Sequence, residues 1–376
     1  MTDMATGGTA PGAPAAPGLD RAAGQDAAPD AVPVRFDGQA GEWFGIWIVN
    51  LLLSIVTLGI YSAWAKVRRN RYFYGNTTIG GRRFDYHATG GQILKGRLIV
   101  IAALAVLNVV SAVFPPALIA IYAVLIPLVP WLLIRATKFS ARNTSWSNVR
   151  FDFHGRYGDA FVTFVLLPLG VLATLGTTLP FLTRRINRFT VNGHSLGRHR
   201  FEMSAPIGGF YMAFAIALAV TVGIAAVLGV LGWLTLSGVA LPTEATQEDA
   251  VGLGVVLGLY AFFFLALLPA SIIYRAMVRN LVYAATALEG GHRFASTVAP
   301  GRLLWIAVTN ALATVATVGL ALPWAQIRMA RYLADNTAVI PNGPLDDFAG
   351  RVERDQSAIG DAFADIEGFD IGAAAI

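Results

Sequence analysis

The residues of this chain with the clearest capacity for chemistry are three pairs of arginines, each of which follows an apolar segment. The two members of a pair stand three residues apart, so they share one face of a helix. Guanidinium groups bind phosphate through two parallel hydrogen bonds, and basic residues also fix the orientation of membrane segments. We therefore expect either a basic cytoplasmic rim that holds anionic lipid head groups or small anions, or topology control alone. The pairs are Arg68 and Arg71, Arg185 and Arg188, and Arg328 and Arg331.

Polar residues inside the apolar segments form the second candidate set. Asn50 and Asn310 occupy equivalent positions in two segments, where an amide can bond to a neighbouring helix or line a cavity. A Thr-x-Gly sequence, at which a helix can break, occurs in three segments. Broken backbone at membrane depth is tolerated where it is buried or lines a cavity, so these positions are candidates for a pathway. They are Thr57, Gly59, Thr174, Gly176, Thr317 and Gly319.

Signs of catalytic chemistry are missing from the sequence. It has no cysteine, and its five histidines form no metal-binding motif such as His-Glu-x-x-His. It also has no phosphate-binding loop and no nucleophile elbow. We therefore expect no enzyme activity, no cofactor and no metal ion.

The composition is that of a polytopic membrane protein. Of the 376 residues, 55% are hydrophobic and only 14% are charged, whereas soluble domains carry roughly 25% charged residues. This composition excludes a soluble enzyme, a disordered chain and a nucleic-acid-binding domain. The net charge of +5 is concentrated in the body of the chain, because both tails are acidic. A basic body suits the anionic cytoplasmic face of a membrane.

Six uncharged stretches are candidates for membrane insertion, since one span requires about 20 apolar residues. The stretch 98–134 is long enough for two spans, and 207–243 and 250–274 supply two more. The stretches 160–183 and 303–327 have basic residues at both ends, and basic loops stay in the cytoplasm. We therefore favour four true spans plus three re-entrant hairpins, with both termini cytoplasmic, over seven complete but kinked spans. The six stretches are 43–65, 98–134, 160–183, 207–243, 250–274 and 303–327.

Internal similarity indicates five repeated units. The short apolar segments superimpose without gaps, so that Arg68 falls on Arg185 and Arg328. An Arg-Phe dipeptide precedes every apolar unit, and the residues around Gly80-Gly81 alternate as in a β-hairpin. The chain opens with the second half of such a hairpin and closes with the first half. The strands at 34–37 and 336–340 are therefore predicted to be adjacent. The Arg-Phe dipeptides begin at Arg35, Arg83, Arg150, Arg200 and Arg293.

The predicted fold is an all-α polytopic membrane protein built from five repeat modules. Each module is a helical hairpin, three of them re-entrant, and small cytoplasmic β-hairpins lie between them. A disordered tail of residues 1–33 precedes this membrane domain of residues 34–340. An acidic, amphipathic tail of residues 341–376 follows it, and this tail docks either on the basic body or on a partner protein. The modules are approximately 34–79, 80–146, 147–195, 196–288 and 289–340.

Three stretches of sequence carry a family resemblance. They are IWIVNLLLSIVTLGIYSAWAKVRR at 46–69, YFYGNT at 72–77 and FDYH at 84–87. With them the chain resembles the YjgN-like family of bacterial inner-membrane proteins, over about 34–340 and most strongly at 43–97. The third module differs most from the sequence pattern of this family, at Pro168, Pro180 and Thr183. The resemblance implies an inner-membrane location, and it carries no catalytic or binding residue because the function of the family is unknown.

Two functions fit these features. The first is a channel or transporter for a small solute or ion, because three equivalent segments have glycine breaks. The alternative is a non-enzymatic protein that binds anionic membrane lipids or acts as a membrane scaffold, because a basic rim accompanies apolar segments without central charges. A continuous pore lined by Thr57, Thr174 and Thr317 favours the first, and a sealed centre with lipid-filled side grooves favours the second. The sequence does not fix the oligomeric state.

Overall fold

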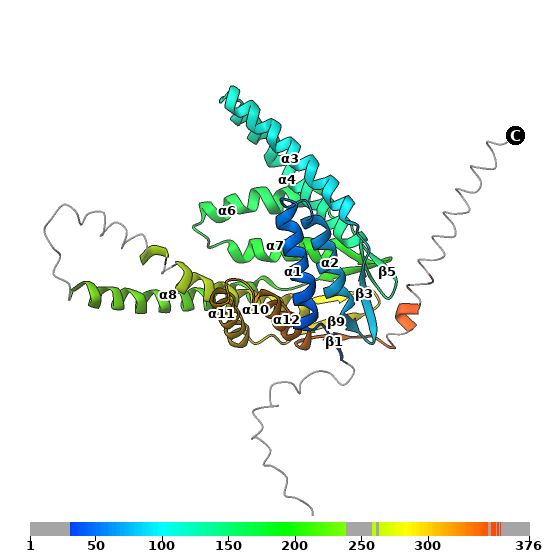
Figure 1. Cartoon of the computed structure of the whole chain (residues 1–376). Helices are drawn as coiled ribbons and strands as arrows, with labels where there is room; N and C mark the ends of the chain where they lie inside the picture. Colours follow the sequence, from blue (N-terminus) through cyan, green and yellow to red (C-terminus); the bar gives the residue numbers. More distant parts are fainter. Residues whose placement is uncertain are drawn as a thin grey trace, which may run out of the picture.

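The computed structural model describes residues 31–237, 258–260, 263–344, 347–350, 352 and 354. The N-terminal tail, the acidic loop at 244–249 and most of the C-terminal tail lie outside the described residues. Within them, strands of three to five residues alternate with pairs of helices along the chain. Figure 1 shows the strands gathered at one end of the molecule, with the helices α3, α4 and α8 projecting away from them.

Ten short strands pair into one closed antiparallel ring. Each strand pairs with its neighbours in the sequence, and β1 pairs with β10, where Val32 lies opposite Val339 and Pro33 opposite Ala338. The predicted adjacency of the two terminal strands is therefore confirmed. The strands are β1 (Val32–Phe36), β2 (Thr77–Ile79), β3 (Arg82–Tyr86), β4 (Thr144–Trp146), β5 (Val149–Phe153), β6 (His194–Leu196), β7 (His199–Met203), β8 (Thr286–Leu288), β9 (His292–Ser296) and β10 (Thr337–Ile340).

The expectation of an all-α protein with separate small β-hairpins is wrong. The hairpins are joined into a continuous barrel because the second strand of each one also pairs with the first strand of the next. Tyr86 of β3, for example, lies opposite Thr144 of β4, on the far side of a complete helical hairpin. Local alternation predicts the hairpin turns, but it carries no information about pairing between strands so far apart in the chain.

The Arg-Phe dipeptides mark the two faces of the barrel wall. Successive residues of a strand face opposite sides, so the arginine projects outwards and the phenylalanine inwards. Four inward rings form a continuous series, with centroid distances of 6.4, 6.3 and 5.9 Å between successive pairs, of which the first two are stacked and the third is tilted. They are Phe84, Phe151, Phe201 and Phe294.

The first Arg-Phe dipeptide is out of step with the other four. Phe84 of β3 lies opposite Trp146, whereas the corresponding residue of β1, opposite Ile79, is Val34. Phe36 therefore stands two positions further along its strand and packs with Trp43 among the helices. An alignment of the five strands on their Arg-Phe dipeptides therefore places β1 two residues out of register with the other four strands.

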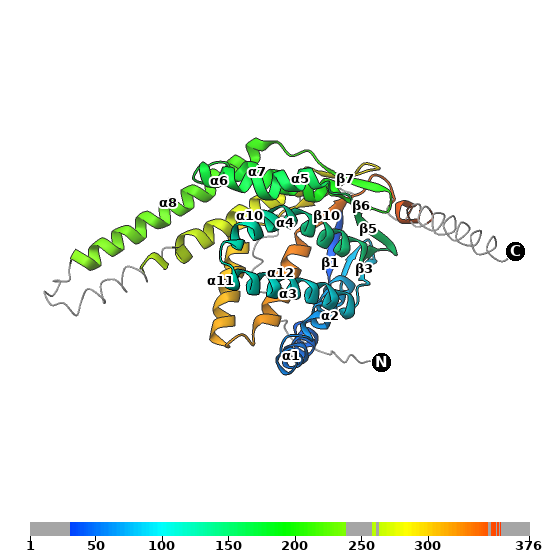
Figure 2. The same cartoon turned by 90° about the horizontal axis from the view of Figure 1, so that it is seen from above.

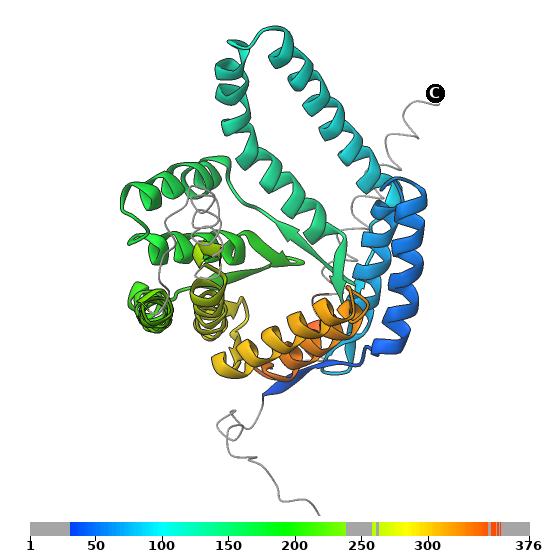
Figure 3. The same cartoon turned by 60° about the vertical axis from the view of Figure 1, so that its left-hand side comes forward.

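Paired helices leave the ring and return to it at five places, and Figures 2 and 3 show the pairs arranged around the barrel. The third pair contains a π-helical segment, η1, and the fourth a second one, η3. The pairs are α1 (Ala40–Val56) with α2 (Ser62–Gly75), α3 (Gly90–Val113) with α4 (Ala117–Arg142), α5 (Tyr157–Phe161), η1 (Val162–Leu166) and α6 (Leu167–Ala173) with α7 (Leu179–Gly193), α8 (Ile207–Ser237) with η3 (Phe263–Leu267) and α10 (Leu268–Ala284), and α11 (Pro300–Ala316) with α12 (Leu322–Asp335).

Four helical segments are long and apolar enough to cross a membrane. They belong to the second and fourth pairs, which correspond to the segments where the sequence predicts double spans. In the first three of them at most 6% of the most apolar part is buried, and the most apolar part of α3 has no buried residue. Such helices require an apolar solvent. The segments are Gly90–Val113, Ala117–Arg142, Ile207–Leu234 and Gly258–Ala284.

The short hairpins turn at the Thr-x-Gly sequences. The helix α1 ends before Thr57, whose hydroxyl donates to the carbonyl of Leu53 at 2.7 Å. Leu58 and Gly59 then adopt positive φ angles of 50° and 88°, which reverse the chain and favour glycine at the second position. Thr174 and Thr317 make the same bond to the residue four positions earlier, at 2.8 Å in both cases.

The C-terminal segment fills one end of the barrel. Phe348, Ala349 and Val352 are buried there, among wall residues that include Leu196 and Leu288. This part of the tail therefore packs on the body of its own chain. The other apolar positions of the predicted amphipathic helix, Leu345, Ile359, Phe363 and Ile366, lie outside the described residues.

Candidate functional site

Two of the six candidate arginines connect neighbouring helical hairpins. Arg71 of α2 donates to the carbonyl oxygens of Tyr86 and Ala88, at 3.3 and 3.4 Å. Arg331 of α12 donates to the carbonyl of Gly38 at 2.9 Å. In both cases the acceptor is in the loop that leads into the next hairpin. Because these guanidinium groups satisfy backbone carbonyls, they hold the hairpins around the ring.

Two further arginines bond or stack within their own hairpins. Arg328 donates to Thr309 Oγ1 at 2.6 Å and to Asn310 Oδ1 at 2.9 Å, and lies over the Trp324 ring. Asn310 also donates to the carbonyl of Ala325 at 3.1 Å and so joins α11 to α12. Arg68 lies 5.7 Å from the centroid of the Tyr61 ring.

Asn50 differs from its counterpart Asn310. It is buried in α1, and its side-chain oxygen has no hydrogen-bond partner within the described part of the chain. The two asparagines share a position in the helical hairpins, but only Asn310 bonds across a helix pair.

The third arginine pair is arranged differently from the other two. Here Arg184 donates to the carbonyl of Ala205 at 2.9 Å, which is the role that Arg71 and Arg331 have in their hairpins. Arg184 stands four residues, about one helical turn, before Arg188. Because Arg184 makes the contact between hairpins, Arg188 does not make it. Arg188 has no hydrogen bond or ion pair to any residue that the structure describes. Arg185 binds Asp159 at 2.7 Å.

Arg185 and Arg188 line a cavity of about 340 Å³ together with two more arginines, Arg156 and Arg200. Asp159 is the sole carboxylate among the residues that line it. Arg156, like Arg188, makes no hydrogen bond or ion pair within the described ranges. Four guanidinium groups against one carboxylate give the cavity a net positive charge, which suits a phosphate or another anion.

A second basic cavity, of about 290 Å³, lies between the last and the first hairpin. Arg302, Arg328 and Arg331 line it together with Trp324 and Asp335. Two of these arginines are already engaged by Thr309, Asn310 and Gly38, as described above. The cavity around Arg156 and Arg188 therefore offers more unsatisfied donors, and we take it as the candidate functional site.

The Thr-x-Gly positions do not meet in one cavity. They lie at the tips of three separate hairpins, where the intervening residues Leu58, Leu175 and Val318 are 94, 95 and 93% exposed. The threonine hydroxyls bond to carbonyls of their own helices. In the described structure these residues end helices and form turns, and they line no common pathway.

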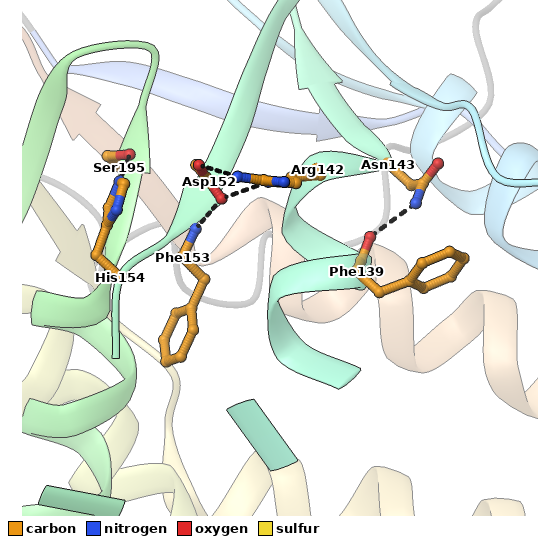
Figure 4. A network of polar contacts seen from close by, with 7 residues as sticks. All are labelled: Phe139, Arg142, Asn143, Asp152, Phe153, His154 and Ser195. Atoms are coloured by element: carbon orange, nitrogen blue, oxygen red, sulfur yellow. Dashed lines mark hydrogen bonds and ion pairs between the residues drawn. The ribbon is translucent and has the colours of Figure 1, made fainter. Parts of the chain in front are cut away.

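The strands next to the candidate site are held by polar contacts that Figure 4 shows. Arg142, at the end of α4, binds Asp152 of β5 through two hydrogen bonds of 2.9 and 3.1 Å. His154 Nε2 lies 3.2 Å from Ser195 Oγ, and His87 Nε2 lies 2.8 Å from Ser145 Oγ. These histidines therefore bridge neighbouring strands. The described residues contain no group of three or more side chains that could hold a metal ion.

Arg156, Arg184 and Arg200 are site residues that sequence reasoning missed. Arg200 was noted only as part of an Arg-Phe dipeptide, and its outward orientation from β7 brings it to the cavity. Arg156 precedes the short helix α5 and belongs to no repeated motif. One signal in the sequence could have identified Arg184. It is an additional arginine directly before the pair, and only the third of the three hairpins has one.

The pKa of Asp152 lies below its ordinary value. Partial burial acts to raise this pKa, but the hydrogen bonds from Arg142 and from the Phe153 backbone outweigh it. A carboxyl whose pKa is lowered by folding stabilises the fold above its unfolded pKa, and this contribution is lost as the pH falls through the folded value. Asp152→Asn should therefore lower the free energy of unfolding at pH 7 by less than about 1 kcal/mol, since the pair is partly exposed.

Thermal unfolding of the purified protein at pH 7 and at about pH 2, well below the ordinary pKa of a carboxyl, measures this effect. The two proteins should differ at pH 7 and converge in acid. A difference of the same size at both pH values contradicts a role for the charged carboxylate. Asp85→Asn, at the corresponding position of β3, is the matched control.

Comparison with known proteins finds a family and several relatives of similar sequence. The family described as "Bacterial protein of unknown function (DUF898)" matches residues 31–366. The chain is 27% identical to the inner membrane protein YjgN of Salmonella typhimurium over 357 residues, which cover 83% of this chain and 88% of the relative. It is 35% identical to the protein of the same name from Escherichia coli K12 over 153 residues, or 40% and 38% of the two chains. No solved structure matches. Because the family covers nearly all of the described residues, the chain belongs to the DUF898 family of bacterial proteins.

Proposed function

We propose that this chain is a bacterial inner-membrane protein that holds the phosphate-bearing head groups of anionic lipids in the cavity around Arg156 and Arg188. The observation that carries the proposal is the presence of these two unpaired guanidinium groups in a cavity lined by four arginines. Inner-membrane location is supported by the four long apolar helices and by the names of the relatives.

The proposed topology follows from the barrel. Every hairpin leaves the ring and returns to it, so both ends of each hairpin lie on one side of the membrane. The 24 residues of α3 extend about 36 Å, which exceeds the roughly 30 Å of the hydrocarbon core. The 17 residues of α1 and of α11 extend only about 26 Å. We infer four true spans, three re-entrant hairpins and a cytoplasmic barrel with both termini beside it.

The lipid proposal also explains where the site lies. Arginines at the junction between membrane helices and a cytoplasmic domain stand at the level of the head groups, where anionic lipids attract them. An arginine fork matches two phosphate oxygens, and four arginines around one cavity exceed what orientation of the chain requires. The internal repeat of five modules stays part of the proposal, with the third module as the one adapted for binding.

Transport, which the sequence placed first, has less support from the geometry. Its motivation was a pathway lined by Thr57, Thr174 and Thr317, and these residues lie at separate hairpin tips. The centre of the barrel is occupied by phenylalanine rings and by the C-terminal segment. A closed centre with basic cavities at the side favours lipid binding over conduction.

Single cysteines in this cysteine-free chain test the topology. Thr190→Cys lies in the third hairpin, which we place on the cytoplasmic side. It should not react with a membrane-impermeant maleimide added to intact spheroplasts, and it should react after the membrane is permeabilised. Pro116→Cys, at the tip of the second hairpin, is the control and should react in both conditions. Reaction of Thr190→Cys in intact spheroplasts means that the third hairpin crosses the membrane completely.

Replacement of the two unpaired arginines tests the binding site. The double variant Arg156→Gln with Arg188→Gln should retain at least about tenfold less phosphatidylglycerol after purification in detergent, since each charged hydrogen bond contributes about 1.5–3 kcal/mol. Phosphorus analysis and mass spectrometry of the bound lipid measure it. Arg293→Gln, which removes an exposed arginine from the barrel wall, should leave lipid retention unchanged.

A double lysine variant, Arg156→Lys with Arg188→Lys, tests whether lipid binding depends on the two-pronged hydrogen bonding of arginine or only on its positive charge. Lysine keeps the charge but lacks the planar fork, so retention should fall between the unaltered protein and the glutamine variant. Equal lipid retention in the unaltered protein and in the glutamine variant contradicts the proposed function.

A further inference from the structure

The barrel lumen is wider than its own wall residues fill. Eight strands enclose a space that inward side chains just fill, and this barrel has ten. At the end formed by the hairpin tips, the additional space is occupied by Phe348, Ala349 and Val352. The Phe348 ring lies 4.1 Å from that of His292, and the Asn342 backbone N–H donates to His292 Nδ1 at 3.1 Å. The C-terminal segment therefore closes the lumen at this end.

The opposite end, where the helices join the barrel, contains an unfilled cavity of about 280 Å³. Three rings of the phenylalanine series line it, together with Val191 of α7 and Val282 of α10. Two of the polar groups in its wall are already paired. Thr286 Oγ1 donates to the carbonyl of Val282 at 2.6 Å, and His194 Nδ1 lies 2.6 Å from the carbonyl oxygen of Thr190. The cavity consequently presents an almost entirely apolar surface.

A neighbouring cavity of about 360 Å³ shares Val282 and Tyr283 with the apolar one, but it is basic. Arg275 lines it and has no hydrogen bond or ion pair in the described portion of the chain. Arg279 lines it as well. Its Nη2 donates to Thr337 Oγ1 at 2.8 Å and its guanidinium lies over the Tyr283 ring, but its buried Nε lacks a hydrogen-bond partner among the described residues. One cavity thus suits a hydrocarbon chain, and the adjoining one has donors for an anion.

We propose that the two cavities form one binding site for a membrane amphiphile with a single hydrocarbon chain and an anionic group, such as a fatty acid or a lysophospholipid. The chain lies against Phe151, Phe201 and Phe294, and the anionic group meets Arg275 and Arg279. One chain fits better than two, because about 280 Å³ lies at the lower limit of ligand pockets, which hold roughly 300–1,000 Å³. The ligand enters from the helix side, since the C-terminal segment closes the other end.

This site is separate from the cavity of the proposed function. Arg185, Arg188 and Phe189 on one face of α7 line the arginine cavity, whereas Thr190, Val191 and the following His194 line the apolar one. The inference rests on the membrane location proposed above, and it does not depend on lipid binding at Arg156 and Arg188. An experiment that refutes one of the two proposed sites therefore does not refute the other.

Photocrosslinking of the full chain in detergent locates the ligand directly. The probe is palmitate with a diazirine near the end of its chain, and the crosslinked peptides are mapped by mass spectrometry. Crosslinks should concentrate in the peptides that contain Phe151, Phe201 and Phe294, and excess palmitate or lysophosphatidylglycerol should suppress them. The better competitor identifies the source of the ligand. Crosslinks confined to the exposed faces of α3, α4 and α8, or crosslinks that neither competitor suppresses, overturn the proposal.

Three variants give a second, independent measurement. Val191→Trp fills the apolar cavity and should reduce competable crosslinking at least tenfold. Val315→Trp makes the same change on an exposed helix end and should leave crosslinking unchanged. Arg275→Gln should weaken palmitate binding about tenfold and leave hexadecanol binding unchanged. If both tryptophan variants fold and crosslink equally, the proposed site is refuted. If Val191→Trp does not fold, the map of crosslinked peptides from the unaltered protein decides whether the site exists.

The double variant Arg156→Gln with Arg188→Gln separates the two proposals. It should crosslink palmitate as the unaltered protein does, whatever it does to the retention of phosphatidylglycerol. Loss of palmitate crosslinking in this variant contradicts a separate second site.

Discussion

Closure of the strand ring, through the pairing of β1 with β10, is the constraint on which the rest of the structure depends. The strands have only three to five residues, so none of them forms a stable sheet with one neighbour. In a closed ring every strand has two neighbours and no edge remains. Each helical hairpin must then begin and end at the ring.

The arginines show how a repeated residue can acquire different roles. Arg71 and Arg331 satisfy carbonyls of the next hairpin and so hold adjacent hairpins together. In the third hairpin Arg184 makes this contact from one helical turn earlier. Arg188 then lies in a cavity, without a hydrogen-bond or ion-pair partner among the described residues. A shift of one turn in the position of a structural arginine is the physical origin of the candidate site.

Features determined by neighbouring residues were predictable from the sequence. The helix breaks at Thr57 and Gly59 depend on one helix end, and the hairpin turn at Gly80-Gly81 depends on a few adjacent residues. The barrel was not predictable, because pairs such as Tyr86 with Thr144 join strands across a complete helical hairpin. The roles of the arginines were also hidden, since the acceptors for Arg71 and Arg331 lie in other hairpins. The amphipathic character of the C-terminal tail was predictable, but the barrel end that buries Phe348 was not.

The most direct test of ring closure is a disulfide between its two terminal strands. Val32→Cys and Val339→Cys place two cysteines at directly opposed positions of β1 and β10, where side-chain carbons are about 4.5–5.5 Å apart. Closure predicts a rapid intramolecular disulfide on mild oxidation in membranes, and none when Val32→Cys is combined with Leu288→Cys of β8, three strands further along the ring. Absence of the disulfide in the first pair, with the protein folded, contradicts a closed ring and with it the arrangement of hairpins and cavities.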